Sequence, residues 1–292
     1  MARLRFHCID HGVPEETIAL LRNACAHRDI EFVAIDAGTF DFSAARRLGH
    51  GDLLYRPAAS ALAIRVEQLL QGAGVASFYC DALGPFFDCL NGPLLFERAG
   101  LPIPRTIYAA TPDRDLLRRA VERLGGFPIV AKWLGHSSGV AVLRVDSLPA
   151  LFSLMDYAGS GANPPLLMEC IADATHFRLI VIGDRAVAAY RNAQQIDDFR
   201  SAGSDDPADY RIEIDPEMAR VAVAATEALG IEMAGVDILR APDGRLALLE
   251  ANFPCYYPQA QLVTGVDIAG MMLDHLTRKA QALASADPAK RA

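Results

Sequence analysis

The chain has 292 residues, of which 52% are hydrophobic and 22% charged, so it can form two or three domains with a substantial core. Its formal net charge of -8 argues against a broad nucleic-acid-binding surface, which needs clustered Lys and Arg. No stretch approaches the roughly 18 apolar residues of a membrane span, and the six scattered cysteines form no CxxC pair, which argues against a disulfide framework or a zinc site.

Residues 1–88 alternate strand and helix patterns and form the first predicted domain. The expected elements are strands at 4–9, 30–35 and 52–55 and helices at 14–28 and 61–71. Short connections between alternating strands and helices are typical of a parallel sheet that is covered on both faces. We therefore expect an N-terminal α/β domain.

Residues 89–165 form the second predicted domain, a small α+β unit. Glycine and proline recur between residues 84 and 104, and we place the domain boundary among them. The expected elements are a strand near Thr106, a helix at 113–124, strands at 127–133 and 140–145, and a helix after Ser147. Residues 159–165 have the composition of a linker.

Residues 166–280 form the third predicted domain, which has longer strands. The expected elements are strands at 166–170, 177–182 and 186–191, a helix from Asp215 to Gly230, two further strands, and a helix at 266–279. The polar residues 192–211 predict a mobile loop. The small, polar residues 281–292 predict a frayed tail.

Two short segments of the third domain carry the strongest chemical signal. They are residues 235–239, GVDIL, and residues 248–252, LLEAN. The Ala-Pro-Asp-Gly sequence at 241–244 is typical of a turn and predicts an antiparallel hairpin. The register that we expect pairs Arg240 with Arg245 across this turn.

The expected register brings three polar side chains to one face of the hairpin. Asp237 would lie opposite Leu248, and the alternation of side chains would place Glu250 and Asn252 on the face of Asp237. Two buried carboxylates repel each other unless a cation or a proton intervenes. Three oxygen ligands suit Mg²⁺, which commonly binds one or two carboxylates together with substrate phosphates. Ordinary salt bridges of these carboxylates are the alternative.

A lysine followed by a glycine-containing loop is the second signal, within residues 127–140, FPIVAKWLGHSSGV. Lys132 lies on an otherwise apolar strand, where an ammonium group needs a partner. The loop at 135–139 offers backbone N–H groups and two hydroxyls, which is how a loop folds over phosphates. No GKS or GKT follows, so the segment is not a P-loop, and a glycine hairpin beside an edge lysine is the alternative.

Arginines form the third signal. Arg178 and Arg191 lie on neighbouring predicted strands, and Arg200 follows in the polar loop. Arginine suits bidentate recognition of phosphate and carboxylate groups. Surface charge on an exposed strand is the alternative for each of them.

Taken with these residues, the chain resembles the ATP-grasp superfamily, and within it the branch of ribosomal-protein glutamate ligases and related amino-acid ligases. The similarity runs from GLPIPRT at 100–106 to TGVDIA at 264–269. It is thinner in the first domain, where YRPAAS at 55–60 resembles a family segment, and residues 189–201 resemble this branch's substrate loop. The resemblance implies an ATP-grasp fold, in which an N-terminal parallel-sheet domain precedes two α+β units that enclose ATP.

The resemblance also implies roles for individual residues. For the nucleotide these are Lys132 at the phosphates, Gly135, Ser137, Ser138 and Gly139 in a lid, Glu169, Cys170 and Ile171 at adenine, and Asp173 at ribose. As catalytic residues, Arg178 and Arg191 would face the γ-phosphate and an acyl phosphate. Asp237, Glu250 and Asn252 match the family's Mg²⁺ ligands in order and spacing, with Mn²⁺ as a second suitable ion.

Three positions depart from the family pattern. Cys89 falls where the family has its first ATP-binding lysine. His176 replaces the aspartate of the usual Asp-hydrophobic-Arg triplet, and Cys255 replaces the glycine that follows a proline after the metal asparagine. The nucleotide side of the site therefore matches the family better than the acceptor side, and the family's substrate should not be copied.

The resemblance implies an ATP-dependent ligase. A substrate carboxylate would attack the γ-phosphorus to give an acyl phosphate and ADP, and an amine would then displace phosphate to form an amide. The expected partners are a small-molecule carboxylate and amine, amino acids or a peptide among them. A small-molecule kinase on the same scaffold and a nucleotide-binding protein without turnover are the alternatives.

The start of the chain and its thiols predict the compartment. The first residues run into Asp10 and His11 without the apolar stretch of a signal peptide. Scattered cysteines are typical of a reducing compartment. We therefore expect a cytoplasmic protein without nucleic-acid or membrane partners, and we leave open whether it is a homo-oligomer.

Overall fold

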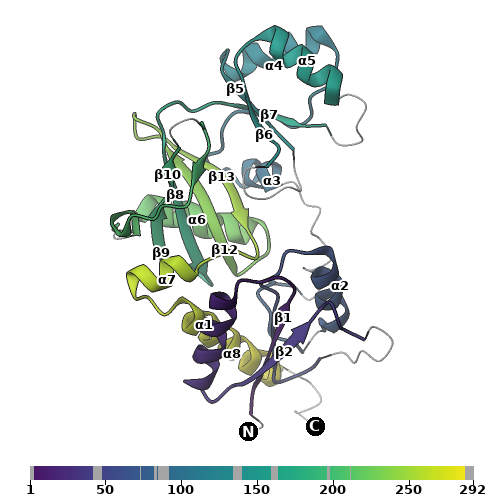
Figure 1. The fold of residues 1–292 in the computed structure, drawn as a ribbon, viewed down its shortest axis with the longest axis vertical. Coiled ribbons are helices and arrows are strands. Elements are labelled where there is room, and N and C mark those ends of the chain that lie inside the picture. Colours follow the sequence, from purple (N-terminus) through teal and green to yellow (C-terminus); the bar gives the residue numbers. More distant parts are fainter. Residues whose placement is uncertain are drawn as a thin grey trace.

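The computed structural model describes residues 3–41, 48–72, 74–81, 84, 92–133, 140–158, 164–195, 198–210 and 212–286. Three sheets with their covering helices are stacked along the longest axis of the molecule (Figure 1). We call them the N-terminal, C-terminal and central units, in the order in which they lie from bottom to top of the figure. Among the described residues, every helix is too short or too polar to cross a membrane.

The N-terminal unit is a parallel sheet, as predicted. Its strands are β1 (Arg5–Asp10), β2 (Glu31–Asp36) and β3 (Asp52–Tyr55), in the order β2-β1-β3. Side chains of β3 alternate between the two faces, so that Leu54 packs with α2 (Ala61–Leu70) while Leu53 and Tyr55 pack in the core shared with α1 (Glu15–Ala26). The core shared with α1 also contains residues of the C-terminal helix α8 (Ile268–Ala286).

The central unit is an antiparallel sheet covered by two helices, which lies at the top of Figure 1. In the order β4-β7-β5-β6, its strands are β4 (Thr106–Ile107), β7 (Leu166–Glu169), β5 (Ile129–Lys132) and β6 (Val142–Val145). Helix α4 (Arg114–Leu124) begins after Asp113, whose carboxylate accepts hydrogen bonds from two backbone N–H groups of the first turn. It ends at Gly125 and packs with α5 (Leu148–Ala158) over the sheet.

The C-terminal unit is a four-stranded antiparallel sheet. In the order β13-β12-β8-β9, its strands are β13 (Leu246–Asn252), β12 (Met233–Arg240), β8 (Thr175–Ile182) and β9 (Arg185–Arg191). Helix α6 (Pro216–Ala228) covers one face, where Val236 and Ile238 are fully buried. On the opposite face, Ile180 and Met233 belong to the core shared with the N-terminal unit.

The structure differs from the predicted elements in one loop, two additional helices and one helix end. The segment predicted as a loop contains a short antiparallel ribbon of β10 (Ala193–Gln194) and β11 (Ser201–Ala202). It also contains a 3-10 helix (Pro207–Tyr210), whose buried Tyr210 stacks on Tyr190 with 4.8 Å between the ring centroids. Helices α3 (Gly92–Arg98) and α7 (Pro258–Thr264) were not predicted, because glycine and proline near their ends resemble loop signals. The predicted end of the last helix at residue 279 was wrong, since Ala280 is buried in the core and the helix continues to Ala286.

The predicted register of the β12–β13 hairpin was also wrong. Arg240 pairs with Leu246 instead of Arg245, and the register shifts again between Asp237 and Ile238. Asp237 therefore lies opposite Glu250 instead of Leu248. A bulge absorbs one extra residue in one strand, and the alternation of polar and apolar residues does not reveal it.

Candidate active site

The three predicted metal ligands converge on one face of the β12–β13 hairpin. Asp237 is 2% exposed and lies directly opposite Glu250. Asn252 is two residues further along β13, on the same face as Glu250. Its Nδ2 donates to Asp237 Oδ2 at 3.1 Å and to Glu250 Oε1 at 2.9 Å. The three side chains thus lie together as expected, but the bulge brings them together in a different register from the one that we predicted.

Two side chains of β8 contact the carboxylate of Asp237. The β8–β12 register places Arg178 beside Asp237, and Arg178 Nε and Nη2 donate to the two carboxylate oxygens at 2.8 and 2.5 Å. His176 Nε2 lies 3.0 Å from Asp237 Oδ1. Burial by itself would raise the pKa of Asp237, but Arg178 and His176 together hold that pKa well below its ordinary value. Asp237 is therefore a buried, ionised carboxylate.

Lys132 joins this cluster from a different unit. It ends β5 of the central sheet, and its Nζ donates to Glu250 Oε2 at 2.5 Å. The Lys132 side chain is 18% exposed and that of Glu250 is 39% exposed. An ammonium group on an apolar strand needs a partner, and Glu250 of the C-terminal unit provides it for Lys132.

The donor set suits a hard divalent cation. The Asn252 amide lies within hydrogen-bonding distance of both carboxylates. Carboxylate and amide oxygens are ligands that Mg²⁺ and Mn²⁺ prefer. No group of three or more His, Cys, Asp or Glu side chains in the described part of the chain could hold a metal ion. A cation bound here would therefore need Asn252 and oxygens of a substrate to complete its coordination.

The segment predicted to bind adenine begins with Glu169, the last residue of β7, whose backbone N–H donates to the Arg105 carbonyl oxygen at 3.0 Å. Cys170 and Ile171 come directly after Glu169, where the ladders of β7 with β4 and β5 have ended. Their backbone groups thus have no partner in these ladders. Asp173 lies in the next turn, is exposed, and has a φ of 53°, which is uncommon for a residue other than glycine.

Arg191 does not join the cluster. The β8–β9 register pairs it with Phe177, so it lies on the sheet face opposite to that of Arg178. Its Nη2 forms an ion pair with Asp209 at 2.8 Å. Asn192 is a further neighbour of the cluster that was not predicted, and its Nδ2 lies 3.2 Å from His176 Nε2. Its only signal in the sequence is an amide directly after the arginine that ends β9.

Two of the predicted features lie outside the described residues. They are the loop residues Gly135, Ser137, Ser138 and Gly139, which follow Lys132, and Cys89.

The aromatic residues after β13 are packed. Tyr257 is fully buried in the core shared by the N-terminal and C-terminal units, and the Phe253 ring lies 5.2 Å from that of Tyr79. Tyr256 is 47% exposed, and its hydroxyl lies 3.3 Å from a carboxylate oxygen of Glu16. A packed turn therefore explains Phe253 and Tyr257.

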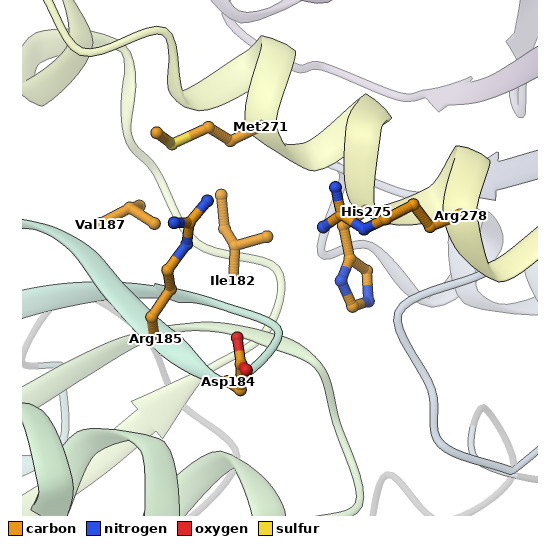
Figure 2. Close-up of a pocket in the computed structure, with 7 residues that line it drawn as sticks. All are labelled: Ile182, Asp184, Arg185, Val187, Met271, His275 and Arg278. Atoms are coloured by element: carbon orange, nitrogen blue, oxygen red, sulfur yellow. The ribbon is translucent and has the colours of Figure 1, made fainter.

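A surface hollow lies apart from the cluster. It has a volume of about 410 Å³ and lies between the β8–β9 turn, with Asp184 and Arg185, and helix α8, with Met271, His275 and Arg278 (Figure 2). None of the predicted site residues lines it. This hollow thus does not locate the ionised cluster.

Comparisons with known proteins agree with the fold. A family model described as the RimK-like ATP-grasp domain matches residues 88–276. A probable alpha-L-glutamate ligase of Pseudoalteromonas translucida is 34% identical over 208 residues, which are 70% of this chain and 67% of that protein. Another, of Parasynechococcus marenigrum, is 34% identical over 196 residues, which are 66% of this chain but 41% of that protein.

Solved structures show the same fold. The ATP-grasp ligase PsnB, complexed with a minimal precursor, Mg and ADP, has a TM-score of 0.71 at 19% identity, and the match covers 96% of this chain and 99% of that one. A RimK domain protein from Sphaerobacter thermophilus has a TM-score of 0.68 at 22% identity, and the match covers 93% of this chain and 98% of that one.

Proposed function

Because this chain belongs to the RimK-like ATP-grasp family and is an ATP-dependent ligase that forms amide bonds, we propose that its reaction takes place at the cluster around Asp237. In this proposal Asp237, Glu250 and Asn252 hold Mg²⁺ or Mn²⁺, and Lys132 binds the phosphates of ATP. The observation that carries the proposal is the convergence of Lys132 with these three side chains from two different units.

The charges of the cluster suit this assignment. When bound, the divalent ion neutralises phosphate charge. Lys132 would exchange its carboxylate partner Glu250 for a phosphate oxygen, and this exchange leaves both groups paired. Arg178 uses Nε and Nη2 to bind Asp237, and its Nη1 has no partner among the described residues. That nitrogen can donate to an oxygen of the transferring phosphoryl group.

The reaction has two steps. A carboxylate oxygen of the first substrate attacks the γ-phosphorus, and the bond to the leaving ADP breaks, which gives an acyl phosphate. The amine nitrogen then attacks the carbonyl carbon, phosphate leaves, and the nitrogen loses its proton. Excluding water between these steps prevents hydrolysis of the acyl phosphate, a role that we assign to the loop at 135–139.

The remaining predicted residues fit the periphery of the site. The backbone N–H and C=O groups of Cys170 and Ile171 are not used in strand pairing, so they are suited to the hydrogen-bonding edge of adenine. Asp173 follows them in the chain, at the position assigned to ribose. Arg191 is the exception, because it lies on the sheet face opposite to Arg178 and pairs with Asp209, so the proposal gives it no part in phosphoryl transfer.

The substrates are a carboxylate and an amine, and amino acids or a peptide are the classes that the proposal favours. Among the curated relatives, several carry the name probable alpha-L-glutamate ligase, and a neighbour in structure is complexed with a precursor peptide. The five cysteines in the described part of the chain are free thiols, which supports a reducing, cytoplasmic location.

A coupled assay tests the proposal. Pairs of amino acids and small carboxylic acids are incubated with Mg²⁺ and ATP, while ADP and free phosphate are measured and amide products are identified by mass spectrometry. We expect ADP and phosphate in equal amounts, with one amide formed for each. ADP without free phosphate would instead indicate a kinase, and ATP binding without ADP formation for every pair would contradict an enzymatic role.

A further inference from the structure

The carboxylate of Glu169, at the end of strand β7, forms several hydrogen bonds. It is 8% exposed and ends β7, directly before Cys170 and Ile171. Its Oε2 accepts from Arg105 Nε at 2.8 Å and lies 2.7 Å from Arg105 Nη2. Its Oε1 accepts from the Arg105 backbone N–H at 3.1 Å and from Arg245 Nη1 at 2.9 Å. The carboxylate is therefore bound by two arginines, Arg105 through both oxygens and Arg245 through Oε1.

The two arginines come from different units. Arg105 directly precedes β4 of the central sheet, and its carbonyl oxygen accepts from the Glu169 N–H at 3.0 Å. Arg245 lies in the β12–β13 turn, directly before the strand that carries Glu250. The Glu169–Arg245 ion pair thus joins the central unit to the hairpin of the proposed metal site.

Gly125 provides the space for one of these arginines. A Cβ atom at Gly125 would lie 2.7 Å from Arg105 Nη2, which is closer than such contacts occur. The φ of Gly125 is 97°, so glycine also suits the backbone at this end of α4. The local structure therefore accommodates Arg105 in the position from which it binds Glu169.

We propose that Arg105 and Arg245 position the adenine-binding segment by clamping the carboxylate of Glu169. The inference rests on the proposed function, since it assumes that Cys170 and Ile171 read the base. Neither arginine touches the nucleotide in this proposal, so both are positioning residues. With Glu169 held on both sides, the backbone of the next two residues keeps a fixed place relative to the phosphate-binding residues on β13.

This pair differs from the second ion pair between the same two units. The Lys132–Glu250 pair consists of groups that would separate when phosphate and a metal ion bind. None of the groups of the Glu169–Arg245 pair has such a role, so this contact persists in the ATP-bound enzyme. The clamp therefore contributes to binding of the base, whereas Lys132 contributes to binding of the phosphates.

Two probes separate these contributions. The dissociation constants of Mg²⁺-ATP and of Mg²⁺-tripolyphosphate are measured by calorimetry for the wild type, Arg245→Gln and Arg245→Lys. The matched control is Arg240→Gln, because Arg240 also forms an ion pair near this turn but with Asp215 of its own unit, at 2.7 Å.

We expect Arg245→Gln to weaken ATP binding about tenfold and to change tripolyphosphate binding by less than about twofold, because a charge-assisted hydrogen bond to the carboxylate is lost. Arg245→Lys should recover part of the ATP affinity, and Arg240→Gln should bind both probes like the wild type. Melting temperatures verify that each variant is folded. If Arg245→Gln proves unfolded, Arg105→Gln removes the clamp from the other side and has the same expected result.

The possible failures are distinguishable. Unchanged ATP affinity in Arg245→Gln, or an equal loss for ATP and tripolyphosphate, overturns the clamp and leaves the proposed function intact. A wild type that binds neither probe overturns the proposed function, and the clamp with it.

Discussion

At the scale of single residues, the two carboxylates of the proposed metal site differ in their burial and in their ion-pair partners. Asp237 is fully enclosed and balances the charge of Arg178, whereas the Glu250 side chain is 39% exposed and contacts Lys132. Removing one partner of a buried ion pair leaves an uncompensated charge, while an exposed pair contributes little to stability. The two residues therefore give different variants, although both are expected to be essential.

We predict that Glu250→Gln loses turnover with little change in stability. Its free energy of unfolding should fall by no more than about 1 kcal/mol, because the pair with Lys132 is partly exposed to solvent. Asp237→Asn should also lose turnover, but its free energy of unfolding should fall by about 3–5 kcal/mol, because Arg178 loses its counter-charge. Phosphate release and urea denaturation measure the two effects. Near wild-type phosphate release by Glu250→Gln would contradict the metal site.

At the scale of elements, helix α6 shows how a local signal and a long-range contact act on one side chain. Asp215 caps the helix, and its Oδ1 accepts from the backbone N–H groups of Glu217 and Met218 at 2.8 and 3.0 Å. Its Oδ2 accepts from Arg240 Nη2 of β12 at 2.7 Å. The hydrogen bond from the Met218 N–H, followed by Arg240, lowers the pKa of Asp215. The cap was predicted, but the contact with Arg240 was not.

We predict that Asp215→Ala lowers the free energy of unfolding by about 1 kcal/mol at neutral pH, the usual contribution of a helix cap. Because the pKa is lowered by folding, this contribution is complete above the ordinary aspartate pKa of about 3.9 and is lost as the pH falls through the lower folded value. The difference between wild type and variant, measured by urea denaturation, should therefore shrink below about pH 4. Asp215→Asn keeps a capping side chain and serves as control. A difference independent of pH would contradict the role of the ionised carboxylate.

At the scale of the whole molecule, Lys279 of α8 joins the N-terminal and C-terminal units. Lys279 Nζ donates to the carbonyl oxygens of Ser77 and Tyr79 at 2.9 and 2.6 Å and to Glu232 Oε2 at 2.5 Å. The segment that leaves the N-terminal sheet is also bound directly, since the Glu232 N–H donates to the Phe78 carbonyl at 2.7 Å. One ammonium group thus connects three segments that are far apart in the sequence.

We predict that Lys279→Met lowers the free energy of unfolding by about 1.5–3 kcal/mol, because a charged donor to three acceptors is lost while the apolar stem is kept. Arg278→Met is the matched control, since the neighbouring side chain is exposed and has no ion-pair partner among the described residues, and it should change stability by no more than about 0.5 kcal/mol. Chemical denaturation of the wild type and both variants measures these free energies of unfolding. Equal effects would show that Lys279 does not hold the units together.

The sequence by itself determined the order and type of most elements and the residue types of the site. Apolar periodicity, helix caps and turns act over a few residues, so the parallel N-terminal sheet and the hairpin with Asp237 and Glu250 could be predicted. The motif spacing also identified the family, through residues such as Lys132 that lie on regular strands.

Only the tertiary structure decided which of these residues meet. The bulge that places Asp237 opposite Glu250, the separation of Arg191 from Arg178 by the sheet, and the joining of Lys132 to Glu250 depend on register and on packing between units. These are sums of many weak contacts between distant segments, and a shift of one residue in a strand reverses the face of every side chain after it. Local sequence patterns do not specify contacts between distant segments, and for this reason the clamp on Glu169 was visible only in the folded chain.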